Sequence, residues 1–336
     1  MLNRFTPKSS LSSLVNPRNS KSKCPTTYLS KSKRISSNGF LLNRGSIPIR
    51  LQSMEVSHQH LLVRYHDDSD QNYVSIADDD TFPQHKVYLT VPRLVKGSHI
   101  IGCSHGLLCV YGNSPTVMAV VWNLSIRKAV GVVVPNVPKD GIYTTALGFG
   151  VCPETNDPKI VKITQIDRRI IAEYITNIPW QVEVFTLSTG VWRNPYSTNL
   201  PRKSIHFCYP QVVIDGLLPI KFTSDRFDNV IISFDMTSEE FTEVNLPDSL
   251  AHQNYLNLSM CKLRESSLVV LERDVAEKDF VVWMMEDGVP KSFTKLFSVD
   301  VNLPHASVLG FTKRGAPIVE NCGVVVVYEP YSEHRD

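Results

Sequence analysis

The sequence predicts an all-β fold, a β-propeller-like (kelch-like) domain of about five or six blades behind a disordered basic N-terminal tail. Three observations lead to this prediction. A hairpin-like unit recurs along the chain, other hairpin-like segments alternate with it, and no segment has the long amphipathic stripe of a helix. Repeats near fifty residues with several strands each are typical of propeller blades.

The recurring unit is a β-branched run that reaches an aromatic residue and then enters a polar turn. Its five copies cover residues 120–128, 182–192, 231–241, 281–289 and 325–330. Their aromatic residues, spaced by 63, 49, 49 and 45 residues, are Trp122, Phe185, Phe234, Trp283 and Tyr328. A weaker copy with Tyr65 and Tyr73 precedes them. We expect the first four rings to occupy equivalent buried positions in successive blades.

Further hairpin-like segments lie between these copies and complete each repeat. They cover residues 100–110, 147–163, 212–222, 258–271 and 308–319. Three of them turn at Gly106, Gly216 or Gly315, and glycine supplies the positive φ that tight hairpins need. An inner hairpin followed by an outer hairpin gives four strands per blade.

The N-terminal residues differ in composition from the remainder of the chain. The first fifty hold eleven Ser and ten Lys or Arg, with no Asp or Glu. Such a stretch buries too little apolar surface to offset the entropy lost on ordering. The sequence therefore predicts a disordered basic tail at residues 1–56, of which residues 1–50 are dispensable for folding, and a propeller-like domain at residues 57–336.

The same tail composition is typical of an organelle transit peptide, which is Ser-rich and Arg-containing and has few acidic residues. We expect a cytoplasmic or nuclear protein, with plastid or mitochondrion as the alternative if residues 1–50 are such a peptide. The second case would describe an organelle-targeted binding domain. Seven cysteines without a C-x-x-C pair indicate free thiols in a reducing compartment.

The charge distribution and the length of the apolar runs argue against two classes of partner, nucleic acids and membranes. The chain has 35 Lys or Arg and 33 Asp or Glu, so 25 basic and 33 acidic residues remain after residue 50. An acidic body lacks the clustered cations that phosphate contacts require, and we expect no nucleic-acid partner. The longest apolar runs, such as residues 117–122 and 324–328, are too short to span a bilayer, and we expect no membrane partner.

One motif suggests an enzyme. Residues 102–106, Gly-Cys-Ser-His-Gly, match the G-x-S-x-G nucleophile elbow of serine hydrolases, so a hydrolase that uses Ser104 is an alternative function. That chemistry needs a strand-to-helix turn, whereas residues 107–111 have the pattern of a second strand. We therefore interpret residues 102–106 as a hairpin turn and expect no catalytic residue and no enzyme activity.

Cofactor and metal motifs are missing from the sequence. There is no P-loop and no dinucleotide fingerprint, so we expect no cofactor. Cys103, His105 and Cys109 have no second ligand pair of the kind that structural zinc requires, so we expect no metal site and interpret the two cysteines as core thiols.

Three aromatic residues border turns and are candidate partner-binding residues. These are Trp180, which follows Asn-Ile-Pro, and the pair Phe207 and Tyr209. Exposed aromatics are common in protein-recognition surfaces. The alternative is that these rings pack inward, as aromatics beside strand ends often do.

Taken in order, six motifs resemble those of the plant F-box-associated domain. They are the G-C-S-H-G-L-L-C stretch at 102–109, W-N-L-S-I-R-K at 122–128, G-F-G-V-C-P-E-T-N-D-P-K-I-V at 148–161, and the segments at 182–193, 233–241 and 283–296. The resemblance runs from about residue 60 to the end of the sequence. It implies a non-catalytic propeller that recognises a target protein, as the substrate receptors of Skp–cullin–F-box ubiquitin ligases do.

The resemblance does not extend to the F-box itself, a helical segment that precedes the propeller in this family. Residues 1–56 show neither its Leu-Pro opening nor its Leu-rich amphipathic turns, so the F-box is missing or degenerate in this sequence. The implied partners are a target protein of unknown identity and a Skp-type adaptor, the latter only if an F-box is present.

Overall fold

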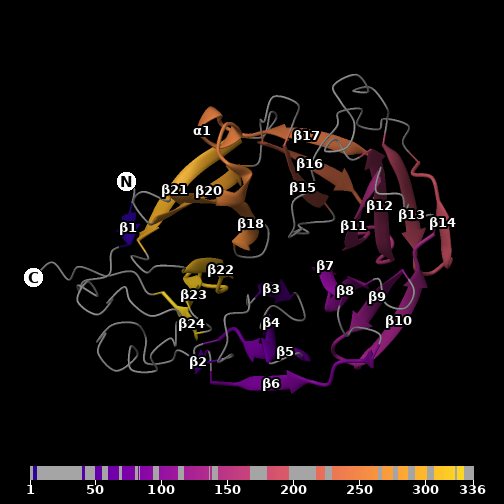
Figure 1. Cartoon of the computed structure of the whole chain (residues 1–336), viewed down its shortest axis with the longest axis horizontal. Coiled ribbons are helices and arrows are strands. Elements are labelled where there is room, and N and C mark those ends of the chain that lie inside the picture. The colour runs from indigo at the N-terminus through magenta and orange to yellow at the C-terminus, as the bar shows by residue number, and fades with distance from the viewer. Residues whose placement is uncertain are drawn as a thin grey trace, which may run out of the picture.

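The computed structural model describes residues 3–5, 40–41, 50–54 and, with gaps, 60–328. The gaps are residues 68–69, 80–81, 83, 94–97, 113–116, 136, 138–142, 167–179, 197–216, 224–228, 264–266, 275–278, 287–291, 301–305 and 322–323. Within the described residues, six β-sheets lie around a ring as the blades of a propeller (Figure 1). The predicted all-β propeller is thus confirmed, with six blades.

Blades one to three each contain four strands in antiparallel order. Blade one consists of β3 (Arg50–Met54), β4 (His60–Asp67), β5 (Asp70–Ala77) and β6 (Lys86–Leu89). Blade two consists of β7 (His99–Ser104), β8 (Leu107–Gly112), β9 (Met118–Asn123) and β10 (Lys128–Val133). Blade three consists of β11 (Tyr143–Val151), β12 (Pro158–Ile166), β13 (Gln181–Thr186) and β14 (Val191–Arg193).

Blades four to six complete the ring. Blade four shows three strands among the described residues: β15 (Leu217–Thr223), β16 (Asn229–Asp235) and β17 (Phe241–Asn245). Helix α1 (Asp248–Ala251) and a 3₁₀ turn (Tyr255–Asn257) follow it. Blade five consists of β18 (Leu258–Leu263), β19 (Ser267–Asp274), β20 (Asp279–Glu286) and β21 (Ser292–Asp300). Blade six contains β22 (Ser307–Phe311), β23 (Pro317–Asn321) and β24 (Val324–Val327).

Three strands lie in the segment for which the sequence predicts a tail. β1 (Asn3–Phe5) pairs in parallel with β21, β2 (Phe40–Leu41) pairs antiparallel with β24, and β3 is the first strand of blade one. β3 thus lies before the predicted boundary at residue 57. β2 supplies the fourth strand of blade six, and the dispensability of residues 1–50 for folding stays a prediction. The disorder predicted for the other residues of 1–56 lies outside the described residues.

The recurring aromatic residues fall on equivalent strands. Trp122, Phe185, Phe234 and Trp283 lie on β9, β13, β16 and β20, and each of these strands is next to the outer strand of its blade. The first three rings are buried, as predicted, whereas Trp283 is half-buried and donates its indole N–H to Glu272 at 3.0 Å. Tyr73 on β5 of blade one meets the Trp122 ring edge to face at 5.7 Å in the seam between blades one and two.

The core lies in the seams between neighbouring blades, and each core cluster draws residues from two of them. In the seam of blades two and three, Ile101 and Cys109 pack with Leu147 and Phe149. Gly102 lets the backbones approach there, because a Cβ at this position would lie 3.0 Å from the carbonyl oxygen of Phe149. Among the described residues, no helix has the length and hydropathy needed to cross a membrane.

Candidate functional site

One end of the blades is formed by tight turns. In an antiparallel sheet the turn between the first two strands and the turn between the last two emerge at the same end, which we call the turn face. Every described residue with positive φ lies in such a turn: His105, Gly106, Arg127, Asn156, Gly190, Glu239 and Gly315. Asp78 and Lys313 show that neighbouring blades share this face, because the Asp78 carboxylate of blade one accepts the Lys313 backbone N–H of blade six at 2.8 Å.

Ser104 lies in one of these turns and not in a nucleophile elbow. It ends β7, and His105 and Gly106, with φ of 49° and 75°, form a two-residue hairpin turn into β8. The Ser104 side chain is buried, and its hydroxyl shares a 2.9 Å hydrogen bond with Nδ1 of the adjacent His105. A strand follows where the hydrolase motif needs a helix, so the hairpin interpretation is confirmed at these residues.

The candidate metal ligands of the sequence do not converge. In the part of the chain that the structure describes, no three His, Cys, Asp or Glu side chains form a group that could hold a metal ion. Cys109 lies in the core, where burial raises the pKa of its thiol well above the ordinary value. It is a core thiol, as expected.

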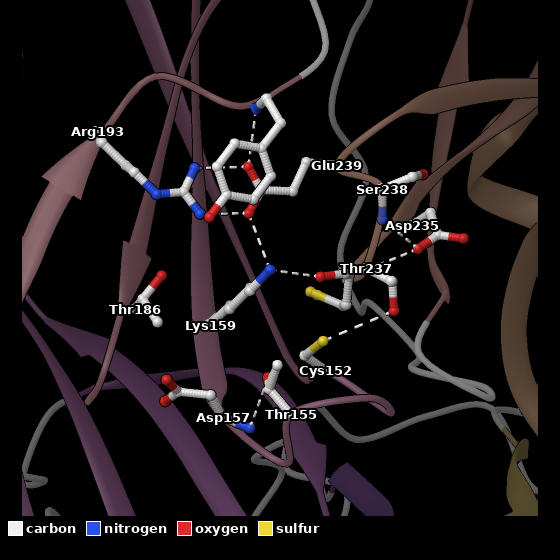
Figure 2. A network of polar contacts seen from close by, with 12 residues as sticks. Cys152, Thr155, Asp157, Lys159, Thr186, Arg193, Asp235, Thr237, Ser238 and Glu239 are labelled. Atoms are coloured by element: carbon white, nitrogen blue, oxygen red, sulfur yellow. Dashed lines mark hydrogen bonds and ion pairs between the residues drawn. The ribbon is translucent and has the colours of Figure 1, made fainter. Parts of the chain in front are cut away.

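A network of polar contacts on the turn face joins blades three and four (Figure 2). At its centre the Glu239 carboxylate accepts hydrogen bonds from Arg193 at 2.7 and 2.6 Å, from the Lys159 ammonium at 2.9 Å and from the Tyr196 backbone N–H at 2.9 Å. Glu239 belongs to blade four and the other three residues to blade three or its end. We call Lys159, Arg193, Tyr196 and Glu239 the blade three–four corner.

The turn between β16 and β17 presents Glu239 to this corner. Asp235 fixes the turn, since its Oδ1 accepts the backbone N–H groups of Thr237 and Ser238 at 2.6 and 3.1 Å. Glu239 then takes φ of 59°, a left-handed conformation that is uncommon for a residue other than glycine, and its side chain is 0 % exposed. A buried carboxylate in a strained turn is held there by its partners.

Lys159 reaches the corner because of its position on β12. Side chains alternate between the faces of a strand, and Val161 and Ile163 pack in the seam of blades three and four. Lys159 lies on the same face, where it is buried and donates to the Met236 carbonyl at 2.6 Å as well as to Glu239. The ammonium therefore ties β12 to the turn of the next blade.

The corner shifts the pKa of the Glu239 carboxyl. Burial alone raises this pKa, but the hydrogen bonds from Arg193 and Lys159 and the backbone bond from Tyr196 outweigh burial. The net result is a pKa below the ordinary value of 4.5, so Glu239 is ionised at neutral pH.

Tyr196 is the exposed part of the corner, with 69 % of its surface accessible. Its ring lies over the Arg193 guanidinium, 3.9 Å from Cζ to the ring centroid, and its backbone is tied to Glu239. Val191 on β14 is exposed on the same blade. A fixed, exposed aromatic ring loses little conformational entropy on binding and is the residue type that dominates protein-recognition surfaces.

The sequence-predicted binding residues are placed differently. Trp180 is 2 % exposed and packs edge to face against Phe241 at 5.9 Å, so its role as a surface aromatic is wrong and the inward-packing alternative is right. Phe207 and Tyr209 lie outside the described residues, and their role stays a prediction. Tyr196 was missed, although it too follows a strand and a proline, Pro195.

The fold and the corner define a β-propeller with a rigid, aromatic-bearing turn face. Residues 49–336 match the family model described as the F-box associated beta propeller domain. The chain belongs to this family, as the resemblance of its motifs implies.

Two curated relatives and two solved structures are also similar to the chain. The relatives are the F-box protein CPR1 of Arabidopsis thaliana, 26 % identical over 60 % of this chain and 52 % of that protein, and the putative F-box protein At3g52320 of the same plant, 29 % identical over 56 % and 44 %. The chain thus spans about half the length of these relatives. The structures are a fucose-specific lectin from Aleuria aurantia, 12 % identical over 86 % and 97 % with a TM-score of 0.46, and the Dos1 propeller, 9 % identical over 84 % and 77 % with a TM-score of 0.45.

Proposed function

We propose that this protein is a non-catalytic protein-recognition module that selects a target for a Skp–cullin–F-box ubiquitin ligase. Membership of the F-box associated propeller family supports the proposal, as do the two relatives that are named as F-box proteins. A propeller supplies a rigid frame for loops and turns, so its function resides in the residues presented there.

The observation that carries the proposal is the position of Tyr196 on the Arg193–Glu239 pair. The guanidinium that supports the ring is held by two hydrogen bonds to a buried carboxylate. The ring therefore has a fixed orientation before any partner arrives, and preorganisation of this kind lowers the entropic cost of association. Asn194 and Ser238, the chain neighbours of Arg193 and Glu239, are exposed and uncharged, as residues at the rim of a recognition surface often are.

The proposal for the ligase adaptor is narrower than the proposal for the target protein. Adaptor binding needs an apolar helical face, and the apolar residues Leu11, Leu14 and Leu29 are separated by prolines at 7, 17 and 25. Proline in a helix interior costs about 3 kcal/mol. We therefore assign only target binding to the propeller, and recovery of ligase subunits with the full chain tests adaptor binding separately.

Affinity purification of the full chain from plant cells tests the proposal. The wild type, Tyr196→Ala and the control Tyr88→Ala are compared, since Tyr88 on β6 is exposed to a similar degree but lies on blade one. Skp-type and cullin subunits are scored separately from other proteins. Recovery of ligase subunits with the wild type supports the ligase role, and their absence alongside a Tyr196-dependent target would leave recognition standing and reject the ligase role for this chain.

A further inference from the structure

We propose that the outer edge of blade two, the free side of β10, binds an extended acidic segment of the target protein by strand addition. β10 lies on the outside of the ring (Figure 1). The proposal rests on the target-recognition function proposed above and adds the chemistry of the recognised segment. Three features of β10 carry it: outward backbone groups, exposed apolar side chains and a local charge opposite to that of the remaining body.

The hydrogen-bond pattern of β10 shows which backbone groups face outward. β10 is the last strand of its sheet, and among the described strands it pairs with β9 alone. The Val134 backbone N–H donates to the Val117 carbonyl at 3.1 Å. Bonded pairs alternate along an antiparallel ladder, so every second residue of β10 bonds to β9 as well. The N–H and C=O groups of Ala129, Gly131 and Val133 therefore point away from the sheet.

The side chains along this edge leave the backbone accessible. Val130 and Val133 are each more than half exposed, and Gly131 between them has no side chain. Among the described residues, the outward groups receive one hydrogen bond, from the Trp192 indole N–H to the Val133 carbonyl at 3.0 Å. An apolar edge with free backbone groups pairs readily with an extended strand of another chain.

The other outer strands are protected in ways that β10 is not. β21 and β24 are each paired with a further strand, β1 or β2. β14 and β6 have only three and four residues, and β17 exposes Thr242, Glu243 and Asn245. Covering segments, short strands and charged side chains are the devices that keep strand edges from pairing. With six residues, β10 is the longest outer strand that no described strand covers.

The charge around β10 indicates the chemistry of the partner. Residues 81–139 contain six Lys or Arg and no Asp or Glu, although the whole chain has 33 acidic residues. Two of these cations are exposed at the start of β10, Arg127 in the preceding turn and Lys128 on the strand. This end of the strand lies on the turn face. An acidic partner therefore meets cations there, and residues 81–139 hold no carboxylate to repel it.

Two other occupants fit this edge less well. A second copy of the chain, paired through its own β10, would bring two such cationic segments together, and like charges across an interface cost affinity. A nucleic acid would use the cations but not the apolar backbone edge. We therefore assign the edge to a peptide segment with β-branched residues along its length and Asp or Glu at one end.

Binding of a synthetic peptide to the full chain tests the proposal. The probe, Val-Thr-Val-Thr-Val-Glu-Glu with a fluorescent group at its N-terminus, places its acidic end near Lys128 when it runs antiparallel to β10. The control probe, Val-Thr-Pro-Thr-Pro-Glu-Glu, has the same charge but lacks two backbone donors. We expect saturable binding of the first probe in fluorescence anisotropy. The control should bind at least about tenfold more weakly, because each lost hydrogen bond is worth about 1 kcal/mol.

Variants of the chain locate the binding site. Val133→Pro removes an outward N–H of β10, and Tyr88→Pro does the same on β6, where the Ala77–His85 backbone bond sets the pattern. We expect Val133→Pro to weaken binding of the first probe at least about tenfold and Tyr88→Pro to leave it unchanged. Lys128→Gln should weaken binding about threefold, whereas Lys295→Gln, at an exposed lysine of blade five, should not.

Hydrogen exchange of the wild type keeps the test decisive even if Val133→Pro does not fold. At saturation the first probe should slow amide exchange in residues 129–133, where outward N–H groups gain acceptors, and leave residues 242–245 of β17 unchanged. Absence of saturable binding, equal binding of the two probes or unchanged exchange in residues 129–133 would overturn the proposal.

Sedimentation of the full chain tests the competing occupant. A concentration-dependent dimer that Val133→Pro abolishes would assign the edge to a second copy and overturn the proposal, whereas a monomer supports it. The peptide measurements use the purified chain alone. A negative result at β10 therefore leaves the affinity-purification test of the proposed function untouched, and the two failures are distinguishable.

Discussion

Arg193 donates hydrogen bonds to both carboxylate oxygens of Glu239, at 2.7 and 2.6 Å, across the seam between blades three and four. Two parallel bonds between a guanidinium and a carboxylate fix orientation as well as distance. Arg193 ends the outer strand of blade three, and Glu239 lies in a turn of blade four. The pair therefore sets both the position of one blade relative to the next and the platform beneath Tyr196.

The first prediction concerns the stability that Glu239 supplies. Glu239→Gln removes the charge that Lys159 and Arg193 share, and loss of one partner of a buried ion pair typically costs about 3–5 kcal/mol. We expect the loss of unfolding free energy to lie in the lower part of this range, because Arg193 is partly exposed and keeps some hydration. Urea unfolding of the variant measures the change in free energy of unfolding.

Glu240→Gln is the matched control for this prediction. Glu240 is the next residue and is exposed, so its substitution should change the free energy of unfolding by no more than about 0.5 kcal/mol. Equal effects of the two substitutions would show that the buried network adds nothing to stability.

The second prediction is the pH dependence of the same contribution. The pKa of Glu239 in the folded protein lies below its ordinary value of 4.5, so folding favours the ionised form. This stability is present at pH above the ordinary pKa and is lost as pH falls through the folded-state pKa. The difference in unfolding free energy between wild type and Glu239→Gln should therefore narrow as pH is lowered from about 7 to about 3. A difference that stays constant over this range would argue against the shift.

The third prediction tests the repeated aromatic position. Trp122 is 1 % exposed, and removal of a buried aromatic side chain typically costs about 3–5 kcal/mol. Trp122→Ala should lower the thermal midpoint markedly, whereas Trp283→Ala should lower it less because that ring is half-buried. Tyr88→Ala, at a ring that is 65 % exposed, should leave the midpoint unchanged. An order other than this would mean that the blades do not share an equivalent ring position.

The fourth prediction separates recognition from hydrolysis. Ser104 is buried in a hairpin turn, so a broad fluorophosphonate probe should not label it. Intact-mass analysis of the probed protein provides the measurement. Stoichiometric labelling that disappears in Ser104→Ala would support the hydrolase alternative.

The blades were predictable because each blade repeats the same order of β-branched and aromatic residues along the chain. The buried rings of Trp122, Phe185 and Phe234 identify their strands from local sequence alone, whichever strands pair with them. The strand β2 was not predictable, because its pairing with β24 uses backbone donors and acceptors that nearly every residue carries. Composition therefore suggested a tail where the structure has strands.

The blade three–four corner could not be predicted from the sequence for a related reason. Residues 235–240 read as an ordinary polar turn, and neither the positive φ of Glu239 nor its partners in another blade are visible in the sequence. Trp180 and Tyr196 both lie beside strands, and only their tertiary contacts determine which ring is buried and which is exposed. Trp180 meets Phe241 in the core, whereas Tyr196 rests on Arg193 at the surface.

The central claim is that the protein recognises a target through Tyr196, and one binding measurement tests it most directly. A protein recovered with the wild type is produced in pure form, and its Kd is measured for the wild type, Tyr196→Ala and Tyr88→Ala. A recognition hot spot is worth about 2 kcal/mol or more, roughly 30-fold in Kd. We predict such a loss for Tyr196→Ala, with unchanged thermal stability because its backbone bond to Glu239 remains, and no loss for Tyr88→Ala. Equal affinity of all three proteins for every recovered partner would contradict the claim.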